Sequence, residues 1–84
     1  MNTADLRTVT TVARLGNFTA AAQELFLAQS TVSRQVCRVE RELGTLLFVR
    51  LPDGVRLSAA GRSFVPVAAG ILADLDHAQA ALRA

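Results

Sequence analysis

Residues 29–43 sort their side chains onto two opposite faces when they are wound into a helix of about 100° per residue. One face is aliphatic and consists of Val32, Val36, Val39 and Leu43. The opposite arc carries small polar or basic groups, from Ser30, Ser33, Arg34, Cys37, Arg38 and Arg41. Because a solvated helix face usually mixes charges of both signs, an arc that is basic and free of acids favours an anionic ligand.

The groups of this arc are those that read double-stranded DNA. Arginine binds guanine edges or phosphates as a fork, and glutamine, which this helix carries outside the arc, pairs with adenine. Short serine and threonine side chains let a helix approach the bases closely. The pattern therefore predicts a recognition helix over residues 29–43, with a chance sorting of few side chains as the alternative.

Two helices are predicted before this one. The first spans about residues 3–15, where Leu6, Val9 and Val12 recur at helical spacing between a cap at residue 2 or 3 and a stop at Gly16. The second is short, with Thr19 as its N-cap, and ends near Phe26.

Only the connector Leu27-Ala28 separates the short helix from the recognition helix. Helices joined so tightly must cross at a steep angle, which predicts a helix-turn-helix over about residues 18–37. A helical hairpin of a small bundle has the same spacing and is the alternative.

After Gly44 the helical spacing of apolar residues ends and strand-forming residues follow, which predicts a β-hairpin over about residues 46–57. Its strands are Leu46–Arg50 and Val55–Leu57, and Leu51-Pro52-Asp53-Gly54 fits a type I turn. Behind a helix-turn-helix such a hairpin is a wing, and an ordinary connector is the alternative.

Ser58 can cap a final helix that runs to about Arg83. Its apolar seam is spaced alternately by three and four residues and comprises Gly61, Phe64, Ala68, Ile71, Leu75, Ala78 and Leu82, with Leu72 widening it. The small domain formed by the preceding residues cannot cover the whole seam. We therefore expect a second chain to cover the rest. Pro66 predicts a bend in this helix, or nucleation of the helix downstream of Pro66.

Composition excludes several classes of protein. The chain has 84 residues, of which 51% are hydrophobic and 19% charged, with one cysteine and one histidine. The sequence shows no set of catalytic residues, no metal-ligand spacing and no glycine-rich phosphate loop. We therefore expect that this region is not an enzyme and binds no cofactor. No stretch is apolar enough to span a bilayer and no secretory signal is visible, which predicts a cytoplasmic protein.

Five motifs, in this order, resemble the N-terminal DNA-binding region of LysR-type transcriptional regulators. They are Gly16-Asn17-Phe18-Thr19-Ala20-Ala21-Ala22, Gln29-Ser30-Thr31-Val32-Ser33-Arg34-Gln35-Val36, Glu40-Arg41-Glu42-Leu43-Gly44, Leu47-Phe48-Val49-Arg50 and Val55-Arg56-Leu57-Ser58-Ala59-Ala60-Gly61. The resemblance covers nearly the whole chain.

The resemblance implies a mostly α fold, in which three helices and a two-stranded wing form a winged helix-turn-helix over residues 1–58. A linker helix over 59–84 would pair antiparallel in a homodimer, and a full-length protein could form a tetramer. A C-terminal effector-binding domain, with its small-molecule inducer, would be absent from this chain, which would then be an excised region, with a naturally short protein as the alternative. The implied setting is the bacterial nucleoid in the cytoplasm.

Site residues follow from the resemblance and from the basic arc. The implied DNA contacts are Thr19, Gln29, Ser30, Thr31, Ser33, Arg34, Arg38, Arg50 and Arg56. Thr19 matches a phosphate contact, and a structural role competes with phosphate binding at Arg50. The implied dimer residues are Phe64, Ala68, Ile71, Leu72, Leu75, Ala78 and Leu82.

Two positions depart from the family pattern. Ala28 replaces the usual Ser or Thr cap of the recognition helix, a loss of about 1 kcal/mol unless Ser30 caps it. Asp53 stands at the wing tip, where an acid repels phosphate and argues against insertion into the minor groove. A helical protein–protein interaction module remains the alternative function.

Overall fold

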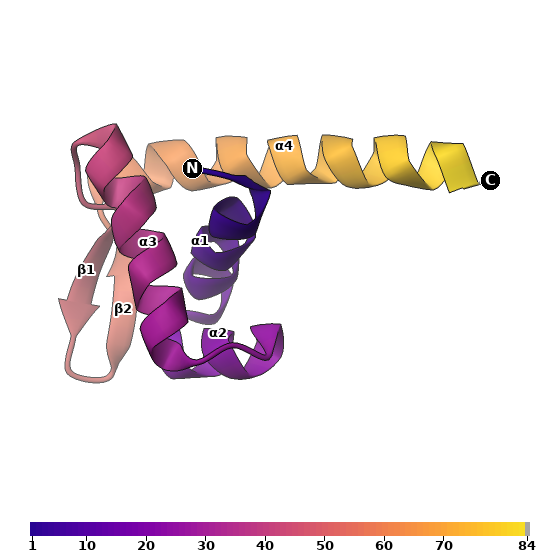
Figure 1. The fold of residues 1–84 in the computed structure, drawn as a ribbon. Coiled ribbons are helices and arrows are strands. Elements are labelled where there is room, and N and C mark those ends of the chain that lie inside the picture. Colours follow the sequence, from indigo (N-terminus) through magenta and orange to yellow (C-terminus); the bar gives the residue numbers. More distant parts are fainter. Residues whose placement is uncertain (84) are drawn as a thin grey trace.

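The computed structural model describes residues 1–83, and its elements follow the predicted order (Figure 1). The elements are α1 (Thr3–Leu15), α2 (Phe18–Leu25), α3 (Gln29–Leu43), β1 (Phe48–Leu51), β2 (Gly54–Leu57) and α4 (Ala59–Arg83). The first three helices and the hairpin form one body, and the C-terminal end of α4 extends beyond it. Ala84, the last residue of the predicted linker segment, lies outside the described residues.

The predicted ends of α1 and α3 are confirmed because local chemistry sets them. The Asn2 side chain accepts a hydrogen bond from the Asp5 amide at 2.8 Å and caps α1. Gly16 and Gly44 end α1 and α3 in the left-handed conformation that favours glycine.

The predicted N-cap of α2 is wrong. Asn17 caps this helix, because its side-chain oxygen accepts from the Ala20 amide at 2.9 Å. Thr19 therefore lies inside the first turn of α2, and Phe18, which precedes it, is a buried helical residue. The end of α2 is as predicted, with Phe26 as its C-cap.

The wing is an antiparallel pair in which Phe48 lies opposite Leu57 and Leu51 opposite Gly54. Leu46 and Leu47 were predicted within the first strand, but they precede β1, which begins at Phe48. The turn residues Pro52 and Asp53 lack the positive φ that other tight hairpin turns need, in agreement with the predicted type I turn.

The Glu40 side chain holds the start of the wing, because its carboxylate accepts hydrogen bonds from the amides of Leu47 (2.7 Å) and Phe48 (3.4 Å). The Val55 amide donates to the Gly16 carbonyl at 3.0 Å, which ties the far end of the hairpin to α1. A Cβ on Gly54 would lie 2.4 Å from that carbonyl oxygen, so this approach requires glycine.

The core lies between α1, α2, α3 and the wing. Its fully covered members are aliphatic or small, and Phe18 and Phe48 pack edge to face with their centroids 6.1 Å apart. The core cluster consists of Val9, Val12, Phe18, Ala21, Ala22, Val32, Val36, Val39, Leu47 and Phe48. Leu43, predicted on the same face, is 37% exposed because it ends α3 beyond this cluster.

Helix α4 begins as predicted and docks closely. The Ser58 hydroxyl accepts from the Gly61 amide at 3.0 Å and caps it. A Cβ on Gly61 would lie 2.2 Å from the Leu47 carbonyl oxygen, so only glycine allows the observed approach. The helix runs through Pro66 without interruption and ends at Arg83, as predicted.

The predicted seam of α4 divides between two environments. Ala68 and Leu72 are only 1% and 6% exposed, because the first half of α4 packs on α1. These two residues are therefore buried within one chain, and the prediction that they contact a second chain is wrong. The periodicity is the same for both surfaces, so spacing alone could not separate them.

An exposed ion pair joins the second half of α4 to α1. Arg7 Nη2 lies 2.7 Å from Asp76 Oδ1. The hydrogen bond from Arg7 lowers the pKa of the Asp76 carboxyl, and the same bond raises the pKa of Arg7. Among residues 1–83, no helix is both long and apolar enough to cross a bilayer.

Candidate nucleic-acid interface

The polar face of α3 is turned outwards. Its valines are buried against α1 and α2, which fixes the rotation of the helix. Five residues of the predicted basic arc are exposed and the sixth, Ser33, is half-buried; the exposed ones are Ser30, Arg34, Cys37, Arg38 and Arg41. Core packing on one side of α3 thus presents the basic arc on the other.

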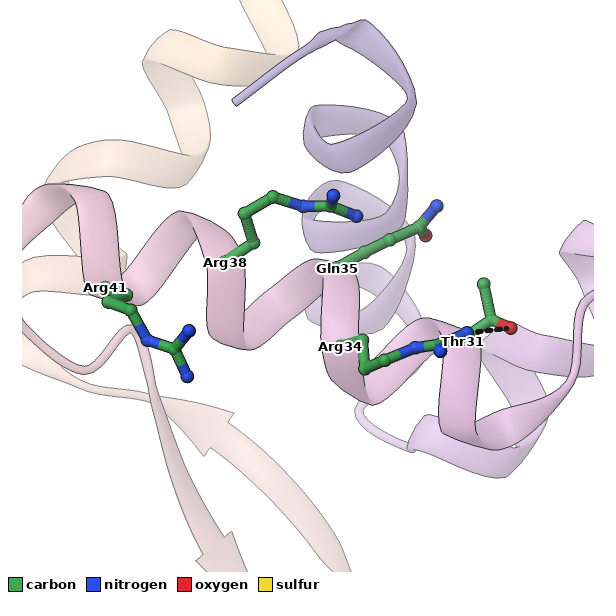
Figure 2. Close-up of a pocket in the computed structure, with 5 residues that line it drawn as sticks. All are labelled: Thr31, Arg34, Gln35, Arg38 and Arg41. Carbon is green, nitrogen blue, oxygen red and sulfur yellow. Dashed lines mark hydrogen bonds between the residues drawn. The ribbon is translucent and has the colours of Figure 1, made fainter.

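The hollow on this face is lined by Thr31, Arg34, Gln35, Arg38 and Arg41 and has a volume of about 360 Å³. Figure 2 shows these five side chains, with Arg34 lying along the helix towards Thr31. Arg34 Nη2 donates to Thr31 Oγ1 at 3.2 Å. Neither Arg34 nor Arg41 has an acidic group within 4.0 Å among residues 1–83, which leaves both charges available to an anion.

Two residues of this hollow were not predicted as contacts. Arg41 belongs to the basic arc but not to the residues that the resemblance implied. Gln35 lies between the polar and aliphatic faces of α3, and a position at the boundary carries no clear signal in the helical pattern.

The first turn of α3 lies beside α2. The Thr19 hydroxyl donates to Gln29 Oε1 at 3.3 Å, which brings a predicted phosphate contact next to a predicted base contact. Ala28 provides no side-chain cap, as expected, and its carbonyl accepts from the amides of Thr31 (3.0 Å) and Val32 (3.2 Å).

Helix α1 supports the polar side of α3 through two contacts. Thr8, which is buried, donates from its hydroxyl to Gln35 Oε1 at 2.5 Å. One turn earlier in α1, Asp5 pairs with Arg38, with 3.1 Å between Oδ2 and Nε. In Figure 2, Gln35 and Arg38 both extend towards α1.

The two predicted wing arginines differ in their surroundings. Arg50 on β1 lies over the Phe18 ring, with 4.2 Å from Cζ to the centroid, so its guanidinium packs on α2. Arg56 on β2 is exposed and lies opposite Val49. The two wing arginines lie on opposite faces of the hairpin, because Arg50 pairs with Val55 and Arg56 with Val49.

Comparisons with known proteins agree with this arrangement. The sequence profile described as "Bacterial regulatory helix-turn-helix protein, lysR family" matches residues 3–62. The chain is 48% identical over 73 residues to the HTH-type transcriptional regulator BudR of Raoultella terrigena, covering 87% of this chain and 25% of BudR. It is 43% identical over 82 residues to the uncharacterized HTH-type transcriptional regulator YusT of Bacillus subtilis, covering 98% of this chain and 28% of YusT.

Solved structures superpose over nearly the whole chain. The CbnR DNA-binding domain in its complex with DNA matches with a TM-score of 0.91 and 34% identity, covering 99% of this chain and 95% of that one. The BenM DNA-binding domain with its catB site 1 DNA matches with a TM-score of 0.94 and 31% identity, covering 99% and 92%.

The predicted winged helix-turn-helix with its long following helix is confirmed by these structures. The chain spans about a quarter of the length of BudR and of YusT. It belongs to the LysR family of bacterial helix-turn-helix regulators.

Proposed function

We propose that this chain is the operator-binding part of a LysR-type transcriptional regulator, which binds double-stranded DNA sequence-specifically as a homodimer. The observation that carries the proposal is the outward basic face of α3, whose hollow is lined by three arginines and no acid. The CbnR and BenM domains, which share the fold, were solved on DNA. In this proposal α3 enters the major groove.

We propose roles for the individual residues. Gln29, Ser30, Thr31, Ser33 and Arg34 lie in the first two turns of α3 and face base edges, whereas Thr19 lies beside them and takes a phosphate. Arg38 and Arg56 supply further phosphate contacts, and Arg50 does so while packed on Phe18. We place the division between DNA-binding and linker segments at residues 1–58 and 59–84, and the protein in the bacterial cytoplasm at the nucleoid.

A second copy is proposed to cover the free face of α4. Val67, Ile71 and Leu82 are 59%, 51% and 88% exposed, although each is a large apolar side chain. Phe64, Leu75 and Ala78 share this side of the helix. Two antiparallel copies of α4 would bury these residues and present two α3 helices to two half-sites, with a tetramer open to a longer protein.

The test is selection of bound sites from random double-stranded DNA, followed by binding measurements at several salt concentrations. The proposal predicts enrichment of interrupted palindromes and a steep loss of affinity with salt. If no sequence is enriched, the alternative of a helical protein–protein interaction module, favoured by the exposed side of α4, takes its place.

A further inference from the structure

Arg38 on α3 is paired with an acid from another helix. Asp5, in the first turn of α1, is 1% exposed at its side chain, whereas the Arg38 side chain is 54% exposed. Their closest atoms, Oδ2 and Nε, are 3.1 Å apart. The pair thus joins a buried carboxylate to a guanidinium that reaches the surface of the proposed DNA-binding face.

The buried carboxylate restrains this arginine. Neither oxygen of Asp5 accepts a hydrogen bond of regular geometry from any group of residues 1–83, and Arg38 is the cation beside it. Because an uncompensated buried charge is costly, Asp5 favours conformations that keep the guanidinium close. The closest contact is made by Nε, which carries one of the five N–H groups of the guanidinium. The four N–H groups of Nη1 and Nη2 are therefore available to another acceptor.

The position of Arg38 along α3 suggests what those four donors bind. Arg38 follows Gln29 by nine residues, which is about 13.5 Å at 1.5 Å per residue. The major groove is about 12 Å wide. If the first turn of α3 lies in the groove, Arg38 reaches the edge of the groove, where the phosphate backbone runs.

We propose that Asp5 is a positioning residue that holds the Arg38 guanidinium in place to bind one DNA phosphate through Nη1 and Nη2. This inference rests on the proposed function. A guanidinium oriented before binding loses less conformational freedom in the complex, and its planar fork suits a phosphate. The contact positions the domain on the duplex without reading sequence.

The first test is Asp5→Asn, measured on the selected operator. This substitution removes a negative charge beside the DNA, so electrostatics alone predicts tighter binding. The inference predicts the opposite, a loss of about two- to tenfold in affinity, because the guanidinium is no longer held. Unchanged or tighter binding would overturn it.

The second test is Arg38→Lys, which keeps the positive charge and a partner for Asp5. A lysine ammonium has no Nε, so it cannot serve Asp5 and present a planar fork to a phosphate. We expect Arg38→Lys to lose affinity to a similar extent. In the Arg38→Lys background, Asp5→Asn should no longer weaken binding; a persistent loss of the same size would mean that Asp5 acts only through α1.

Thr8→Val is the matched control. It removes the other polar contact between α1 and α3, from Thr8 to Gln35, and leaves Asp5 and Arg38 in place. Melting curves of all variants separate folding from binding. If Thr8→Val weakens operator binding as much as Asp5→Asn does, the effect belongs to helix packing and the inference fails. If the unsubstituted chain shows no salt-dependent operator binding, the proposed function itself fails.

Discussion

Arg50 stacks over Phe18, with its guanidinium carbon 4.2 Å from the centre of the ring. This contact joins β1 to the first residue of α2, and Phe18 in turn packs edge to face on Phe48 of the same strand. The wing therefore packs on the helix-turn-helix through the Phe18–Phe48 pair, with the Arg50 guanidinium stacked on Phe18. Arg50 has a structural task whether or not it also binds a phosphate.

Arg50→Ala should lower the free energy of unfolding by about 0.5–2 kcal/mol through loss of the cation–π contact. Chemical denaturation measures this change. Arg56→Ala, on the adjacent strand and exposed, is the control and should leave stability within about 0.5 kcal/mol. An Arg50→Ala variant as stable as the unsubstituted chain but much weaker on DNA would make Arg50 a phosphate ligand alone.

Gly61→Ala should destabilise the domain by about 1–3 kcal/mol, because the new methyl group would meet the Leu47 carbonyl oxygen at 2.2 Å. Gly70→Ala is a matched change in the same helix, where a Cβ meets nothing within 4 Å. It should stabilise α4 by about 0.5–1 kcal/mol through helix propensity. Thermal unfolding of both variants distinguishes them, and equal melting temperatures would refute the close docking of α4 at Gly61.

Attachment of a bulky maleimide to Cys37 should abolish DNA binding and leave the fold intact. The thiol is exposed and projects from α3, where it lines a hollow with Glu40, Arg41 and Leu46. Circular dichroism checks the fold and a mobility-shift assay checks binding, with reagent-treated Cys37→Ala as the control. Full binding by the modified protein would place Cys37 outside the contact surface.

Joint replacement of Ile71 and Leu75 by Asp should yield monomers that retain the winged domain and bind the operator far more weakly. Each buried Leu or Ile contributes roughly 1.5–3 kcal/mol, and the two half-site affinities combine only in a dimer. Sedimentation measures the oligomeric state, and Ala80→Asp, exposed on the other side of α4, should leave it unchanged. A dimer that survives the double substitution would place the interface elsewhere.

The parts of the fold that local chemistry controls were predictable. Asn2, Gly16 and Gly44 define helix ends by capping, and the valines of α3 recur at a period that only a helix can bury. The cap of α2 was misassigned because Asn17 and Thr19 are both good capping residues, and burial of Phe18 in the core decides between them.

Contacts between elements distant in sequence left no local pattern. Nothing near Asp5 in the sequence shows that α1 lies against the polar side of α3, so its pairing with Arg38 was not foreseen. Likewise, Ala68 and Leu72 share the seam period of α4 with Ile71, and only the packing of α1 assigns them to the inside of one chain.

The central claim is that the basic face of α3 binds the operator, and Arg34→Ala tests it most directly. Arg34 is exposed, hydrogen-bonds only to Thr31 among the contacts of residues 1–83, and stabilises no core element. Fluorescence anisotropy on the selected operator should show a loss of about 1–3 kcal/mol, whereas Arg83→Ala, which removes an equal charge from the far end of α4, should change binding little. Equal affinities of the unsubstituted chain and Arg34→Ala would contradict the assignment of α3 as the recognition helix.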